Sequence, residues 1–336
     1  KKQERLWIKA FVDVMGRLAD DLAPKQLHEQ RTPFFLFGAS FYFAMNQAHK
    51  IGMDAHFKAI LQSLAAYALN MHNYKEAEDL YLRFVEANKV SGNAELEAAA
   101  YHQIGRIAEG KRDFDLAEVW YRKSLKIKEK QGNEHGAANT YGQLGNMAQE
   151  KRDFDSAEIW YKKALEIFEK QGNEHGTASS YHQLGIIAEE KRDFDSAESW
   201  YRKSLEIKEK QGNEHGAAIS YHQLGRIAQE KRDFDSAEFW YKKSLEIFEK
   251  QGNEHGSAST YGQLGNLADL QGHFEESGKW LIKAILLFSK CNAPADVEQA
   301  ANNFQIIYKH AEPDTQTKLK AIWEGAGLPA GALDDG

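Results

Sequence analysis

Apolar and small residues recur at helical spacing along most of the chain. Around Tyr141 they occupy positions i, i+3, i+4 and i+7 of one helix face, namely Ala138, Tyr141, Leu144, Gly145 and Ala148. A second, broader apolar face follows directly, at Phe154, Ala157, Trp160, Tyr161, Ala164, Leu165 and Phe168. The pattern predicts two successive amphipathic helices joined by a short turn, with small residues such as Gly145 and Ala157 where the two helices approach closely.

The ends of these helices carry residues that helix termini favour. Asp153 precedes the second helix, where its side-chain oxygen can accept a hydrogen bond from a free backbone N–H. Asp155 and Glu158 add negative charge near the positive end of the same helix. The link QGNEHG then supplies Gly172 for a left-handed C-cap and Asn173 for the next N-cap, so the sequence predicts alternating helices and turns.

The sequence of this helical pair repeats several times with a period of 40 residues and no gaps. The phrase YxQ(L/I)G opens five copies, at Tyr101, Tyr141, Tyr181, Tyr221 and Tyr261. Divergent copies of the repeat continue in the same phase upstream, in residues 73–93, and downstream, in residues 273–294. One pair cannot cover its own apolar faces, whereas stacked pairs bury them continuously, so the repetition predicts a solenoid rather than separate globular domains.

Composition narrows the possible partners and the compartment. The net charge is −7 and the isoelectric point is about 6.0, which disfavours a dominant nucleic-acid or anionic-membrane surface. Cys291 is the only cysteine, which excludes an internal disulfide and fits a reducing compartment, so we expect the cytoplasm. The densest apolar run, residues 33–45, is too short for a membrane span, and we expect it to be a buried helix.

The letters of each copy resemble tetratricopeptide repeats. One copy has the family's residues at the matching offsets: Tyr221, Leu224, Gly225, Phe234, Ala237, Tyr241 and Ser244. Three features depart from the family pattern, because Ala228 replaces an aromatic residue, the closing proline is missing and the period is 40 rather than 34 residues. The longer period is similar to that of kinesin light chains and of bacterial signalling arrays.

The resemblance implies an all-α fold, a right-handed α-solenoid of stacked antiparallel helix pairs. It covers about residues 57–290, which we expect to form the repeat array. Residues 1–56 are expected to form a divergent N-terminal helical pair, with the helices in residues 3–50. Residues 291–336 are expected to form C-terminal capping helices and a tail, with Pro313 opening the last helix.

In this family the first helix of each pair lines a concave groove that usually holds an extended peptide or a partner helix. Differences between the copies gather in four columns at offsets of three and four residues, which place them on one stripe of that helix. The candidate partner-binding residues on this stripe are His102, Arg106, Glu109, Asn139, Asn146, Gln149, His182, Ile186, Glu189, His222, Arg226, Gln229 and Asn266. Free drift of solvent-facing positions is the alternative explanation, although the equally exposed KRDFD and QGNEHG segments stay almost fixed.

Chemical roles follow from the residue types. Arg106 and Arg226 suit charge-assisted hydrogen bonds to a partner's carboxylates, and Asn146 and Asn266 suit pairing with a peptide backbone. Variation also occurs on the second helix, in one column from Val119 to Lys279 and another from Lys128 to Phe288. We expect these second-helix positions to be half-buried, with a contact on the convex side or self-association as the alternative.

Several patterns suggest chemistry that the spacing does not support. The histidines of the NEHG links lie on successive stacked pairs, too far apart to share one metal ion, so we expect a loop-ordering role and no metal. The Lys-Arg pair of each KRDF turn is largely neutralised by its aspartate, so nucleic acid binding is not expected. The segment at residues 325–331 lacks a preceding strand and is not a phosphate loop. We expect no cofactor and no catalysis.

The leading hypothesis is a non-catalytic scaffold that binds a protein or peptide segment in the concave groove. The alternative is the sensor arm of a larger signalling or defence protein, a nucleotide-binding switch ATPase or a caspase-like protease with attached repeats. The first residue, Lys1, suggests a piece of a larger protein, although tag removal or processing would give the same start. Near-identical copies leave self-association open.

Overall fold

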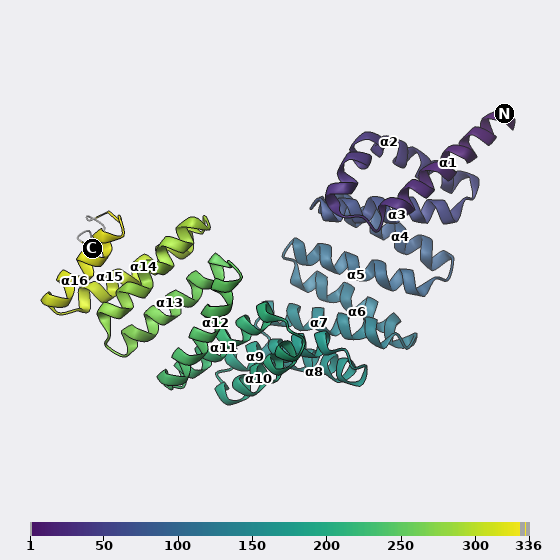
Figure 1. The fold of residues 1–336 in the computed structure, drawn as a ribbon. Coiled ribbons are helices and arrows are strands. Elements are labelled where there is room, and N and C mark those ends of the chain that lie inside the picture. Colours follow the sequence, from purple (N-terminus) through teal and green to yellow (C-terminus); the bar gives the residue numbers. More distant parts are fainter. Residues whose placement is uncertain (1, 330–332, 334–336) are drawn as a thin grey trace. The chain divides into compact units, whose positions relative to one another are not determined.

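The computed structural model describes residues 2–329 and 333, which form sixteen α-helices and no strand (Figure 1). The helices of the first half are α1 (Lys2–Leu22), α2 (Leu27–Ile51), α3 (Asp54–Asn70), α4 (Tyr74–Val90), α5 (Ala94–Gly110), α6 (Phe114–Lys130), α7 (Glu134–Glu150) and α8 (Phe154–Lys170). Those of the second half are α9 (Glu174–Glu190), α10 (Phe194–Lys210), α11 (Glu214–Glu230), α12 (Phe234–Lys250), α13 (Glu254–Leu270), α14 (Phe274–Lys290), α15 (Pro294–His310) and α16 (Pro313–Gly325). The all-α fold predicted from the sequence is confirmed.

The capping residues predicted from the sequence determine the helix boundaries. The Asp153 side chain accepts a hydrogen bond from the backbone N–H of Ser156 at 3.1 Å, and Asn173 accepts one from Gly176 at 3.0 Å. Gly172 has φ +64°, the left-handed conformation that glycine adopts without strain. The helices from α5 to α13 each begin at such an Asn or Asp cap, so these boundaries are set by residues within a few positions of them.

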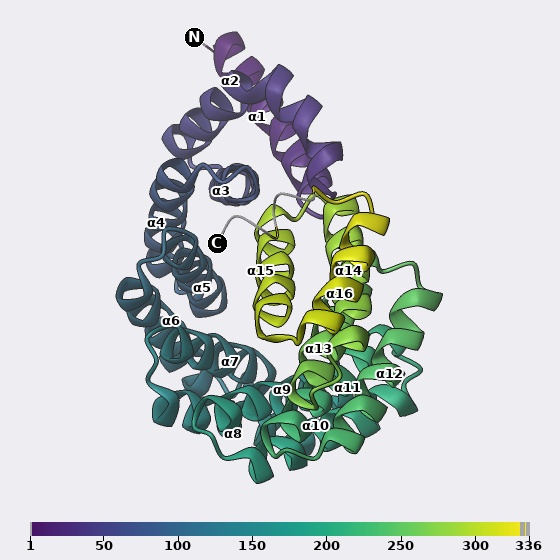
Figure 2. The same cartoon turned by 90° about the vertical axis from the view of Figure 1, so that its left-hand side faces the viewer.

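Contacts divide the chain into two units, Lys1–Gln171 and Gly172–Gly336, and each is described by itself. In both units consecutive helices pair, and we call the first helix of each pair an A helix and the second a B helix. The A helices are α3, α5, α7, α9, α11, α13 and α15, and the B helices are their successors. Within the first unit, Figure 2 shows α3, α5 and α7 along one side and α4, α6 and α8 along the other.

The A helices α5, α7, α9, α11 and α13 each pack closely on their own B helix through a glycine. A Cβ atom placed on Gly145 of α7 would lie 2.6 Å from the ring of Tyr161 on α8, which is closer than real Cβ atoms approach. Gly185 and Tyr201 repeat this contact at 2.5 Å in the second unit. The tyrosines are fully buried, so the prediction that small residues mark the closest helix contacts is confirmed.

The two variable columns of the B helices behave differently from each other. Val119, Ile159 and Phe239 are exposed, so the expectation that this column is half-buried is wrong. Phe168 and Phe248 of the other column are buried and belong to the core. One column therefore belongs to the surface and the other to the packing between helices.

The first and last helical pairs of the described chain differ in how much of their apolar surface is buried. Pro313 begins α16 as predicted, and Trp323 of that helix donates a hydrogen bond to the carbonyl of Pro329 at 2.9 Å. In α2 the apolar run at residues 33–45 is only partly buried: Phe34 and Phe41 enter the core, whereas Phe35 is 86% exposed. The expectation of a buried helix is therefore wrong for one side of α2. No described helix is long and apolar enough to cross a bilayer.

Candidate binding face of the A helices

The residues predicted to bind a partner share one side of the A helices, which we call the A-face. In the first unit it carries His102, Arg106 and Glu109 on α5, and Asn139, Asn146 and Gln149 on α7. In the second unit it carries His182, Ile186 and Glu189 on α9, His222, Arg226 and Gln229 on α11, and Asn266 on α13. Arg106, Asn139 and Arg226 are exposed, and the others are half-buried.

The Glu/Gln column of the A-face is a set of hydrogen-bond acceptors for buried tyrosines. The hydroxyl groups of the B-helix tyrosines reach beneath the A helix, and each donates to the residue twelve positions earlier. The pairs are Tyr121–Glu109 at 2.7 Å, Tyr161–Gln149 at 3.0 Å, Tyr201–Glu189 at 3.0 Å and Tyr241–Gln229 at 3.1 Å. In the next copy the tyrosine is replaced by Leu281 and the acceptor by Asp269, so the two positions change together. The Glu/Gln alternation therefore preserves a structural bond.

The histidine column lies under the surface rather than on it. His102, His182 and His222 each pack against the tyrosine of their own pair, with ring centroids 5.1 to 5.5 Å apart. Burial, together with nearby cations, lowers the pKa of each of these histidines to about 4. The imidazoles are therefore neutral at pH 7.

Two half-buried lysines occupy the hydroxyl groups that lie near the histidines. Lys128 donates a hydrogen bond to Thr140 at 2.8 Å, and Lys208 donates one to Ser220 at 2.9 Å. In the copy that has Phe248 at this position, the corresponding Thr260 lies 3.2 Å from Nδ1 of His222 instead. Within the described residues, Nδ1 of His102 and of His182 is buried without a hydrogen-bond partner. Burial lowers the pKa of both lysines to about 8.

Three of the polar candidates connect neighbouring helices. Arg226 of α11 forms an ion pair with Glu189 of α9 at 2.6 Å. The Asn266 side chain accepts a hydrogen bond from Asn303 of α15 at 2.9 Å. The Asn146 side-chain oxygen lies 2.7 Å from the hydroxyl of Tyr161, whose one proton is shared between Asn146 and Gln149. These side chains already have partners inside the protein, so a ligand must compete with those bonds.

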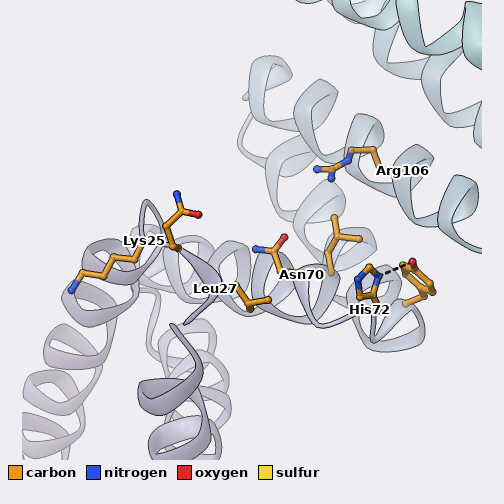
Figure 3. Close-up of a pocket in the computed structure, with 8 residues that line it drawn as sticks. Lys25, Leu27, Asn70, His72 and Arg106 are labelled. Carbon is orange, nitrogen blue, oxygen red and sulfur yellow. Dashed lines mark hydrogen bonds between the residues drawn. The ribbon is translucent and has the colours of Figure 1, made fainter. Parts of the chain in front are cut away.

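Arg106 is placed differently, beside a cavity of about 390 Å³ in the first unit. The cavity is lined by Lys25, Gln26, Leu27, Leu69, Asn70, His72, Tyr74 and Arg106. Figure 3 shows Arg106 and Asn70 extending into this space from two different helices, whereas the Lys25 ammonium group points away. His72 Nδ1 is 2.9 Å from the Tyr74 hydroxyl.

The charge of this cavity favours an anionic group. None of its eight lining residues is a carboxylate, and Arg106 donates a side-chain hydrogen bond to Gln103 on the same helix at 3.0 Å. A guanidinium group that is exposed and faces a polar cavity can bind a carboxylate through two parallel hydrogen bonds. Among the described residues no cluster of three or more His, Cys, Asp or Glu side chains is arranged to hold a metal ion.

Sequence reasoning located the A-face but missed what lies beneath it and beside it. The tyrosine acceptors could have been identified from the sequence, because Leu281 replaces the tyrosine and Asp269 replaces its acceptor in the same copy. The lining residues Lys25, Asn70 and His72 carry no repeat signal, because all three precede the five copies that open with YxQ(L/I)G. Their proximity to Arg106 depends on the packing of α1 to α5 and has no signature in the letters.

The chain belongs to the tetratricopeptide repeat family. The family profile matches residues 57–130, 136–210 and 216–290, which is more than half of the chain. No curated protein sequence matches this chain. Repeats of this family form scaffolds that bind protein partners, and the helical pairs described above are of this kind.

Solved structures with similar folds come from several kinds of protein. BtubC from P. vanneervenii matches 72% of this chain and 92% of its own at 20% identity, with a TM-score of 0.54. The apo form of RapI matches 95% of this chain and 87% of its own at 14% identity, with a TM-score of 0.69. A signal transduction ATPase with a tetratricopeptide repeat sensor from Pyrococcus horikoshii matches 96% of this chain and 51% of its own at 17% identity, with a TM-score of 0.58. These similarities concern the fold alone.

Proposed function

We propose that this protein is a non-catalytic cytoplasmic scaffold that holds a peptide or protein segment along the A-face. The observation that carries the proposal is Arg106, an exposed cation beside a cavity whose lining has no carboxylate. Membership of a family whose repeats bind protein partners supports it further. We also propose the division into an N-terminal pair at 1–56, an array at 57–290 and a capping region at 291–336.

The proposed ligand contacts are graded by how free each side chain is. Arg106 and Asn139 are exposed and lie on α5 and α7 of the first unit. Arg226 would have to exchange Glu189 for a ligand, because the ion pair between them is already 2.6 Å long. We therefore propose that Arg106 binds an acidic group of the ligand and that Asn139 binds its backbone.

The test measures binding of a peptide library of varied charge to the full chain. Native protein is expected to select acidic peptides, with affinity falling as salt concentration rises. Arg106→Glu should abolish that selection, whereas Lys126→Glu, an exposed charge reversal on the B helix α6, should preserve it. Equal selection by both variants would exclude Arg106 as the acidic-group contact. Binding of no peptide class by native protein would contradict the scaffold proposal itself.

The second candidate is a sensor arm that transmits binding to an effector domain. The similarity to a protein with a tetratricopeptide repeat sensor motivates it, and this chain spans 51% of that protein's length. This candidate shares the A-face contacts and adds a further domain. A parent reading frame that encodes a phosphate-binding loop or a Cys-His pair would support it, and a stand-alone frame would contradict it.

A further inference from the structure

Apolar side chains are unusually exposed on α1 and α2, the first pair of the first unit. On α1, Trp7 is 72% exposed and Val14 is 61% exposed. On α2, Leu36 is 63% exposed and Phe43 is 50% exposed. Scattered apolar residues on a surface need no explanation, but several large ones on two packed helices indicate a contact surface.

These side chains form one continuous face. Trp7, Phe11 and Val14 are spaced i, i+4 and i+7, so they lie on one stripe of α1. Leu36 and Phe43 are seven residues apart on one stripe of α2. The rings of Phe11 and Phe43 meet edge to face with centroids 5.8 Å apart, which joins the two stripes. We call these five residues the α1–α2 patch.

The patch lies away from the side that packs on the rest of the unit. Val12, Met15 and Gly16 of α1 point into the core, and a Cβ atom on Gly16 would lie 2.4 Å from the ring of His56 on α3. In a repeat array an apolar outer face of a helical pair is ordinarily covered by another pair or by a partner. The described part of α15 and α16, at the other end of the chain, has Ile306 as its exposed large apolar residue.

We propose that the α1–α2 patch binds the same patch of a second copy of this chain, with the two α1 helices antiparallel. The charges of α1 are divided between its halves. Lys2, Arg5 and Lys9 outweigh Glu4 in the first half, and Asp13, Asp20 and Asp21 outweigh Arg17 in the second. Antiparallel packing about a two-fold axis near Phe11 places each positive half beside the negative half of the partner, whereas parallel packing places like charges together.

The first test is the mass of the full chain in solution over a range of concentrations. Native protein is expected to reach twice its 38.1 kDa mass by about 100 µM, the weak affinity reflecting a patch smaller than a standard interface. Trp7→Glu combined with Val14→Glu should remain monomeric with unchanged helicity, because both side chains are largely exposed.

Matched controls use exposed apolar residues on other sides of the same helices. Leu6 is 61% exposed and Phe35 is 86% exposed, and helical spacing turns each of them about 80 to 100° from its neighbours in the patch. Leu6→Glu with Phe35→Glu should dimerise like native protein. A native chain that stays monomeric, or a dimer that survives the patch variant, would overturn the proposal and assign the face to another occupant.

The second test determines the direction of the helices. In a Cys291→Ser background, Phe11→Cys lies at the proposed two-fold axis, where the two helices approach most closely, and should form an intermolecular disulfide. Gln3→Cys lies near the end of α1, about 25 Å from its symmetry mate, and should not form one. Efficient cross-linking at both positions would contradict the antiparallel arrangement.

Discussion

The Glu/Gln column of the A-face supplies hydrogen-bond acceptors to the buried tyrosines. Tyr201 donates to a carboxylate oxygen of Glu189 and Tyr241 donates to the amide oxygen of Gln229, at nearly equal distances. A buried hydroxyl without an acceptor is costly, so either residue is suitable and an apolar one is not. Variation between repeats therefore reports structural equivalence here and does not by itself identify a ligand contact.

This equivalence predicts opposite outcomes for two substitutions at Glu189. Glu189→Gln should change the free energy of unfolding by about 1 kcal/mol or less, since it keeps the acceptor for Tyr201 and weakens only the ion pair with Arg226, whose guanidinium is exposed to solvent. Glu189→Leu should cost about 1–3 kcal/mol, because the Tyr201 hydroxyl loses its partner. Urea unfolding followed by circular dichroism measures both. Equal destabilisation by the two variants would show that charge, not the acceptor, is what matters.

The buried histidines predict that acid destabilises the fold. Their pKa is about 4 in the folded protein against 6.5 in the unfolded chain, so the unfolded state binds protons first as the pH falls. The stability is fully present above pH 6.5 and declines towards pH 4, by about 2 kcal/mol per histidine at pH 5. Replacing His102, His182 and His222 with glutamine should flatten this dependence. An unchanged pH profile in the triple variant would contradict the burial argument.

The half-buried lysines Lys128 and Lys208 predict a second rise of stability with pH, in the alkaline range. The pKa of Lys128 and of Lys208 is about 8 in the folded protein against 10.5 unfolded, so stability rises as the pH increases from 8 to 10.5. Lys128→Phe, which copies the residue at Phe168, should stabilise the protein at pH 7 by about 1–3 kcal/mol and reduce that rise. Thermal unfolding at pH 7 and pH 10 tests this. A lower melting temperature of Lys128→Phe than of native protein at pH 7 would mean that the space around Lys128 does not accommodate an aromatic ring.

At the scale of helices, the boundaries could be predicted from the sequence and the connections between helices could not. Asp153, Gly172 and Asn173 act on backbone groups within four residues, so their roles can be predicted from the local sequence. The ion pair of Arg226 with Glu189 joins positions 37 residues apart, and it forms only once α9 and α11 are packed. For the same reason the cavity beside Arg106 could not be foreseen.

Two glycines of α7 illustrate how packing overrides helix propensity. Gly145→Ala should destabilise the protein by about 2–3 kcal/mol, because its Cβ would meet the buried ring of Tyr161. Gly142→Ala, three residues earlier, meets nothing within 4 Å and should stabilise the helix by up to about 1 kcal/mol. Chemical denaturation of both variants provides the comparison. Stabilisation by Gly145→Ala would contradict the close contact between α7 and α8.

At the scale of the whole molecule, the constant period makes complete repeats interchangeable. Deleting residues 181–220 joins Ser180 to Tyr221, which stands at the same position of the repeat as Tyr181. The shortened chain should keep its helicity per residue and unfold cooperatively, since every remaining pair retains equivalent neighbours. Deleting residues 181–200 instead joins half an A helix to half a B helix and should lower both. Circular dichroism and thermal unfolding distinguish the two outcomes, and equal behaviour would contradict the stacking of pairs.

The bond between tyrosine and Glu or Gln has an evolutionary consequence. Codons for glutamate and glutamine differ by one nucleotide, and either residue satisfies the same tyrosine. A single mutation at position 109, 149, 189 or 229 can therefore change the charge of the A-face by one unit while the fold is maintained. A lineage can sample several electrostatic surfaces in this way, and new partners can be acquired without a period of instability.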